Sequence, residues 1–404
     1  MAPLLRQQLR KQLAMPTTTI AICLLGLAGG VLAALMIAGF RFAIEYGAHL
    51  IGNDTYWQEP LPTTLRFTIP IAAALLIYGI FRLSGSRYVR MGIPYVIHRM
   101  KQHYGMLPWR STVNQFFGGI IALIAGYSVG REGPAVHLGA AASTWLGFHV
   151  DAPKNALRTL AACGIAAAIA ASFNTPLAAM VLVMEVVLRE YKVHVFIPVM
   201  LSAVAGSLIT EEIFGVASEL AMLSAQDIPT TQLPWVVILG VVLGVVGVIF
   251  KKLMLDVMDT VKDMSLLTRL LFAGIITASL AVIIPTSLGP GLTAIEQVIN
   301  HQGEMSLLTT LLLAKLFAAA IALGMGIPGG LIGAVFGIGA IIAAVFVGAV
   351  DVLGIQQALS FDSFILLGMA GILAACIHAP MAALLAIVEL SRSVEIIIPA
   401  MLVI

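Results

Sequence analysis

The sequence has few charged residues: 22 basic and 20 acidic side chains make up 10% of its 404 residues. An average soluble domain carries roughly 25%, so charges this sparse cannot cover the surface of a water-soluble protein. This shortage excludes a soluble enzyme and a disordered chain. Because 60% of the residues are hydrophobic, the composition indicates an all-α polytopic membrane protein.

Cysteines and ligand-binding motifs are scarce too. The three cysteines, Cys23, Cys163 and Cys376, all lie in apolar runs, which excludes a disulfide scaffold and indicates small buried hydrophobes. A net charge of +2 gives no electrostatic support for a nucleic-acid partner. The eight histidines lack metal-ligand spacing, and neither an ATP-binding motif nor a nucleophile–base pair is present. We therefore expect no metal, no cofactor and no enzymatic activity.

Uncharged runs fill most of the chain, but several do not fit a single membrane crossing. The run 159–184 contains Pro176 and the run 305–350 contains Pro328, whereas the run 133–150 is short. Long runs broken by proline and paired with short ones predict broken and re-entrant helices.

The distribution of charge predicts the orientation. Basic residues gather in the N-terminal tail and in the stretches 82–110 and 251–269. The stretches 43–65 and 211–227 carry acidic residues, and 211–227 has no basic one. Because cytoplasmic loops are enriched in Lys and Arg, we expect the first three segments in the cytoplasm and the last two outside.

Residues 164–185 and 368–389 resemble one another: each has Pro-x-Ala-Ala and a glutamate nine residues after the proline. A Gly-rich turn precedes each copy. This similarity predicts one transmembrane domain with two homologous halves, 1–190 and 191–404, each with a broken helix, and a site at the interface of the repeats. Chance similarity between Ala-rich helices is the alternative.

The sequence Gly130-Arg131-Glu132-Gly133-Pro134 separates two uncharged runs. A helix that begins at Pro134 would direct backbone N–H groups and a positive dipole end at an anion. Glu132 would block that site when ionised and release it when protonated, so we predict a gate. The alternative is an Arg131–Glu132 ion pair at a membrane boundary.

Two other Gly/Pro breaks favour the same chemistry. They are Met91-Gly92-Ile93-Pro94 and the stretch that ends in Pro328-Gly329-Gly330-Leu331-Ile332. We predict that the anion is bound mainly by backbone N–H groups. The candidate anion-binding residues are Met91, Gly92, Ile93, Arg131, Gly133, Gly330, Leu331 and Ile332.

These motifs, together with Phe173-Asn174-Thr175-Pro176-Leu177-Ala178, resemble the CLC family of chloride channels and proton-coupled anion antiporters. The resemblance covers essentially the whole chain. It implies a homodimer with inverted repeats and one anion pathway per subunit. Glu132 matches the family's gating glutamate.

The sequence departs from the family pattern at three places. Met91 stands where the family usually has an anion-binding serine, which resembles the fluoride-selective members, and Ile332 stands where Phe is usual. Val186 occupies the position of the antiporters' inner proton-relay glutamate, which favours uncoupled conduction. No tyrosine follows Tyr191, so we expect the second half to lack the last helix that supplies one.

Other ionisable residues have ordinary explanations. We expect His137 to be a core histidine, with a role in tuning Glu132 as the alternative, and Lys315 to extend to a membrane interface. Glu185, beside Val186, is a structural residue or a second proton-path candidate after Glu132.

The predicted function is passive or proton-coupled transport of chloride, or a similar small anion, across a bacterial inner membrane. Chloride is the expected bound ligand, and protons, membrane lipid and a second subunit are the expected partners. Proton-coupled fluoride export and a non-CLC secondary transporter with an anion site at helix N-termini stay open.

Overall fold

The computed structural model describes residues 19–52, 61–85, 91–215, 223, 226–300, 304–353 and 359–404. Within these residues the chain forms helices and no strand, apart from an isolated antiparallel bridge between Gly130 and Gly330. Helices suit so apolar a sequence, because a membrane-spanning helix satisfies its backbone hydrogen bonds internally. The predicted basic tail, at residues 1–17, lies outside the described residues. In the predicted acidic stretch 211–227, residues 216–222, 224 and 225 lie outside them too.

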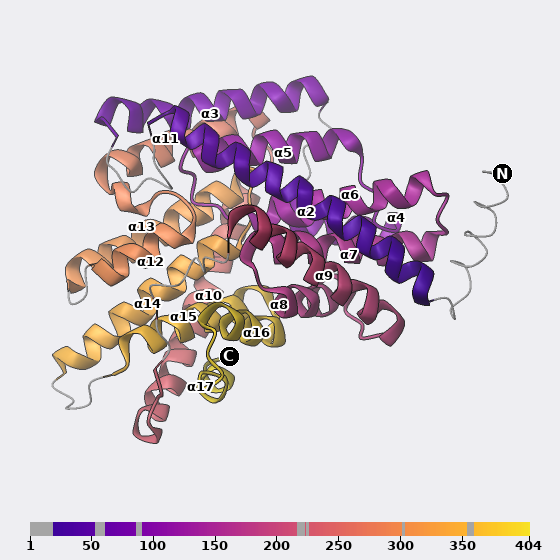
Figure 1. The fold of residues 1–404 in the computed structure, drawn as a ribbon. Helices are drawn as coiled ribbons and strands as arrows, with labels where there is room; N and C mark the ends of the chain where they lie inside the picture. The colour runs from indigo at the N-terminus through magenta and orange to yellow at the C-terminus, as the bar shows by residue number, and fades with distance from the viewer. Residues whose placement is uncertain are drawn as a thin grey trace. The chain divides into compact units, whose positions relative to one another are not determined.

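Within the described part of the chain, eight helices are long and apolar enough to cross a bilayer. The protein is therefore an integral multi-pass membrane protein. Figure 1 shows the arrangement of its helices along the chain. These helices are α2 (Thr19–Leu50), α3 (Thr63–Ser84), α7 (Lys154–Phe173), α9 (Val193–Phe214), α10 (Leu233–Val261), α11 (Leu266–Ile283), α13 (Met305–Gly324) and α14 (Ile332–Val352).

Further α-helices lie between and after these spans. They are α4 (Gly92–His103), α5 (Trp109–Ile124), α6 (Glu132–His149), α8 (Pro176–Leu182), α12 (Gly291–Asn300), α15 (Phe361–Ile377), α16 (Pro380–Ser391) and α17 (Ile397–Val403). The π-helical turn η2 (Val183–Leu188) continues α8, and the 3₁₀ turns η3 (Thr230–Gln232) and η4 (Pro285–Ser287) precede α10 and α12.

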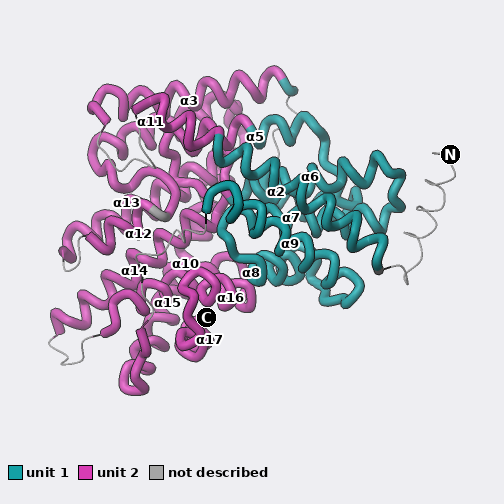
Figure 2. Tube along the Cα trace, in the orientation of Figure 1, with its two compact units in different colours: residues 1–42, 84–116, 132–218 teal, residues 43–83, 117–131, 219–404 magenta. Residues whose placement is uncertain are grey.

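The chain divides into two compact units, and each is built from separate segments (Figure 2). Unit 1 comprises residues 1–42, 84–116 and 132–218, and unit 2 comprises residues 43–83, 117–131 and 219–404. In unit 1, α7 packs against both α6 and α9. In unit 2, α14 packs against α12, α13 and α15. The division into halves at residue 190 stays a prediction.

The innermost helices approach closely through glycines. In unit 1, a Cβ added at Gly139 of α6 would lie 2.3 Å from the carbonyl oxygen of Gly164 in α7. In unit 2, a Cβ added at Gly339 of α14 would lie 2.3 Å from the carbonyl oxygen of Gly368 in α15. Small residues let membrane helices pack backbone to backbone, and the same kind of contact occurs in both units.

The two similar segments of the sequence both contain a broken helix. The C-caps of α7 and α15 are Asn174 and His378, where the backbone turns left-handed with φ of 57° and 58°. Pro176 and Pro380 then begin α8 and α16. Proline is favoured at the first helical residue because the N–H that it lacks has no partner inside the helix.

The prediction that Lys315 extends to a membrane interface is wrong. Its side chain is fully buried in unit 2, and its ammonium group donates to the carbonyl oxygens of Ser287, Leu288 and Gly289 at 3.2, 3.2 and 2.6 Å. The turn η4 leaves these carbonyls outside a regular helix, so they satisfy the ammonium inside the protein.

Candidate functional site

The chain breaks between α5 and α6, where the sequence predicts the gate. Gly126 takes a left-handed φ of 78°, and α6 begins at Glu132, two residues before the predicted start at Pro134. Glu132 is 1% exposed and Gly133 is buried, whereas Arg131 is partly buried. A carboxylate in the first turn of a helix faces its positive dipole end, so burial here places Glu132 at the predicted anion-binding end of α6.

A second break of the same form precedes α14. Gly326 has a left-handed φ of 86°, Leu331 is the N-cap, and α14 begins at the buried Ile332. Each break runs from a helix end through a left-handed glycine to a new helix, and the corresponding positions lie 200 residues apart. The equal backbone form indicates that the two breaks are equivalent parts of a repeat.

Within unit 2, the two break segments bind each other. The Gly130 N–H donates to the Gly330 carbonyl at 2.7 Å, and the Gly330 N–H donates to the Gly130 carbonyl at 2.6 Å. A Cβ added at Gly329 would lie 2.4 Å from the Cβ of Val129, so the approach needs glycine. The N–H of Gly330, which was predicted to donate to the anion, therefore donates to the Gly130 carbonyl instead.

The predicted third break begins α4 in unit 1. Met91 is the N-cap, with extended backbone and no capping bond from its side chain. Gly92 has a left-handed φ of 76° and donates its N–H to Oε1 of Gln115, at 3.0 Å. The prediction that α4 binds an anion therefore depends on Ile93, because Pro94 has no N–H. The sequence analysis missed Gln115, although a polar residue in the uncharged run 111–130 was a usable signal.

A sequence model described as "Voltage gated chloride channel" matches residues 69–404, which is most of the chain. The chain belongs to the CLC family.

Curated CLC relatives align along nearly the whole chain. The H(+)/Cl(-) exchange transporters ClcA of Vibrio campbellii and Vibrio vulnificus are 27% and 28% identical over 403 and 402 residues. The alignments cover 95% of this chain and 84% and 85% of the two relatives.

Solved CLC structures share the fold. A slow cyanobacterial Cl-/H+ antiporter matches with a TM-score of 0.80 at 22% identity, over 95% of this chain and 91% of the antiporter. A CLC-type fluoride/proton antiporter matches with a TM-score of 0.80 at 21% identity, over 96% of this chain and 94% of the chain of that antiporter. The CLC architecture predicted from the sequence is thereby confirmed.

His137 of this CLC chain is a buried residue between three helices of unit 1. Its ring stacks on Tyr95 of α4 at 5.9 Å, and its Nε2 lies 3.5 Å from the hydroxyls of Ser111 and Thr112 in α5. His137 follows Glu132 by five residues, which is about 140° around α6. The contacts fit the core histidine that the sequence favoured.

Glu185 lies in the π-helical turn η2 and is partly buried. Val186 lies in the same turn. π-Helical turns are rare and are frequent at functional sites. A role for Glu185 in a proton path stays a prediction.

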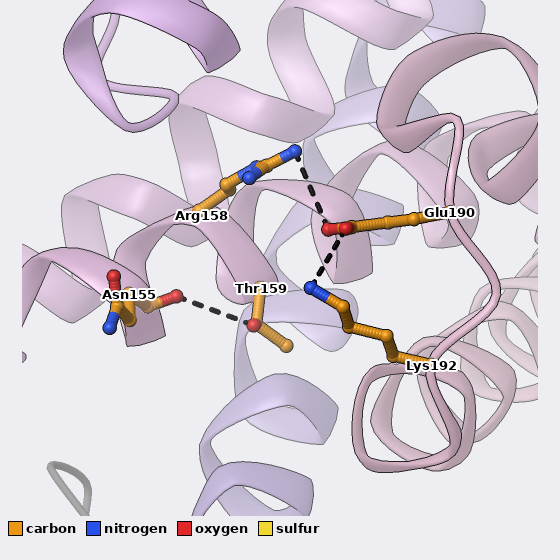
Figure 3. A network of polar contacts seen from close by, with 5 residues as sticks. All are labelled: Asn155, Arg158, Thr159, Glu190 and Lys192. Atoms are coloured by element: carbon orange, nitrogen blue, oxygen red, sulfur yellow. Dashed lines mark hydrogen bonds and ion pairs between the residues drawn. The ribbon is translucent and has the colours of Figure 1, made fainter. Parts of the chain in front are cut away.

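A polar network follows η2 in the segment that joins it to α9 (Figure 3). The carboxylate of Glu190 forms an ion pair with Nζ of Lys192 at 2.9 Å and another with Nη2 of Arg158, in α7, at 3.5 Å. The hydrogen bond from Lys192 and the charge of Arg158 hold the pKa of Glu190 below its usual value. This network anchors the end of η2 to α7.

Proposed function

We propose that this CLC protein transports chloride, or a similar small anion, across a bacterial inner membrane and that Glu132 is its gate. The single observation that carries the proposal is the buried carboxyl group of Glu132 at the first residue of α6. An ionisable group inside a membrane protein indicates an ion or proton pathway. The relatives named as exchange transporters support a transporter over an enzyme.

The chemistry follows from the first turn of α6. Its free N–H groups, including that of Gly133, and its dipole attract an anion. The ionised carboxylate of Glu132 competes with that anion for the same positive end, whereas the protonated carboxyl is neutral. Protonation of Glu132 therefore opens the site, and Arg131 raises the local anion concentration.

We propose that transport is coupled to protons. The names of the ClcA relatives support coupling, although Val186 cannot carry a proton. Glu185 then supplies the inner proton site. The protein acts as a homodimer in lipid.

Fluoride export is the second candidate. The structural match to a fluoride/proton antiporter and the absence of a hydroxyl at Met91 favour it.

Purified protein in liposomes tests these proposals. An imposed chloride gradient should drive chloride flux and uphill proton movement, recorded with a chloride and a pH electrode. Glu132→Gln imitates the protonated gate, so chloride flux should persist while proton movement and pH dependence disappear.

Glu190→Gln is the matched control, because it removes a carboxylate of the same unit outside the helix start and should leave both properties unchanged. Unchanged pH dependence in Glu132→Gln would refute the gate. Fluoride flux without chloride flux would select the second candidate.

A further inference from the structure

Gln115 holds the start of α4 with one end of its amide. The residue lies on α5 in unit 1 and is 0% exposed. Its Oε1 accepts the N–H of Gly92 at 3.0 Å. Only the oxygen of an amide can accept from an N–H group, so this bond determines which end of the side chain carries the NH₂ group.

The other end of the amide is a buried donor. Among the described residues, Nε2 of Gln115 has no hydrogen-bond partner. A buried donor without an acceptor costs free energy, and Nε2 lies within one amide group of the start of α4. The N-cap, Met91, offers no side-chain capping bond.

We propose that Gln115 is a ligand of the transported anion: Oε1 fixes the start of α4 and Nε2 donates to the anion. This inference rests on the proposed function. The NH₂ group supplies the side-chain donor that Met91 does not. An anion fits better than a neutral acceptor, because the positive end of α4 and the NH₂ group both favour negative charge.

Two variants test whether Gln115 contributes to anion affinity. Gln115→Glu keeps an oxygen for the Gly92 N–H and removes the NH₂ donor, whereas Gln115→Met removes both ends without adding charge. If Gln115 is a ligand, both variants weaken the Kd for chloride about 10- to 100-fold, the effect of losing one hydrogen bond to a charged group. The carboxylate of Gln115→Glu repels an anion in either case, so a positioning role alone is recognised by loss of affinity in Gln115→Met with bromide bound away from Nε2 in the unmodified protein.

The control is Gln232→Glu in unit 2. Gln232 is also buried, and its Oε1 accepts the N–H of Ser360 at 3.4 Å. The same chemical change there should leave chloride affinity unchanged.

Calorimetry with sodium chloride on the full chain in detergent gives the Kd values. Bromide added to crystals of the unmodified protein should give anomalous density within hydrogen-bonding distance of Nε2. Wild-type affinity in either Gln115 variant, or bromide bound elsewhere only, would overturn the inference.

Failure of the proposed function is distinct from this result. In that case the unmodified protein itself neither binds chloride nor moves it in liposomes, and both proposals fall together. If the unmodified protein transports chloride and the Gln115 variants bind it equally well, the inference alone is wrong.

Discussion

Replacing Gly139 with alanine should push α6 away from α7. The added Cβ would lie 2.3 Å from the carbonyl oxygen of Gly164 and 2.5 Å from the Cβ of Ala168. Neither neighbour is the end of a flexible side chain, so neither can rotate away. The backbones of the two helices must separate instead.

The size of the effect follows from this geometry. Ordinary contacts to a Cβ begin at 3.4 Å, so the added atom lies about 1 Å too close to the backbone. Overpacking a well-packed core typically costs about 1–3 kcal/mol. Because the opposing atom is a backbone carbonyl in the buried interior of unit 1, we expect a loss near the upper end, about 3 kcal/mol.

Heating detergent-solubilised protein and measuring the fraction that stays monodisperse tests this expectation. Gly139→Ala and its counterpart in unit 2, Gly339→Ala, should both lower the midpoint temperature. Gly244→Ala on α10 is the control, because nothing lies within 4 Å of the added Cβ. Equal midpoints for Gly139→Ala and Gly244→Ala would refute the argument from close helix contact.

Two further predictions concern buried and surface charges. Lys315→Met should destabilise the protein by about 2–4 kcal/mol, because each carbonyl left without a donor costs about 1–3 kcal/mol while removal of a buried ammonium offsets part of the loss. The exposed Lys252→Met should change the same thermal midpoint little, and equal shifts would contradict the role of the three carbonyls. Glu190→Gln should cost less than about 1 kcal/mol at neutral pH, since its partners are half exposed. Because the folded state lowers the pKa of Glu190, the difference in stability between the unmodified protein and Glu190→Gln should be fully present at pH values above the ordinary pKa of glutamate. It should vanish as the pH falls through the lowered pKa. A stability difference that grows in acid would contradict this expectation.

Local features of the fold were predictable because glycine and proline act over a few residues. Pro176 and Pro380 mark the helix starts that the structure shows. The start of α6 was predicted two residues late, since proline is tolerated anywhere in the first turn and does not define its first residue.

Long-range pairings were not predictable from the sequence. The sequence does not indicate that Gly130 and Gly330 bind each other. A glycine indicates a position where the backbone can adopt unusual angles, but not the residue to which it will be hydrogen-bonded. The prediction for Lys315 was wrong for the same reason. A lone lysine in an apolar run suggests a membrane interface unless three distant carbonyls are known to surround its ammonium group.

The two breaks have the same backbone conformation but different side chains at the helix start. Glu132 begins α6 and Ile332 begins α14, each two residues after a glycine of the Gly130–Gly330 bridge. Their helix starts supply the same kind of N–H groups and the same dipole. Only Glu132 can gain or lose a proton. If Glu132 is the gate, the proton dependence of transport therefore comes from a single side-chain difference between two equivalent helix starts, and the repeated fold supplies the helix dipole at both.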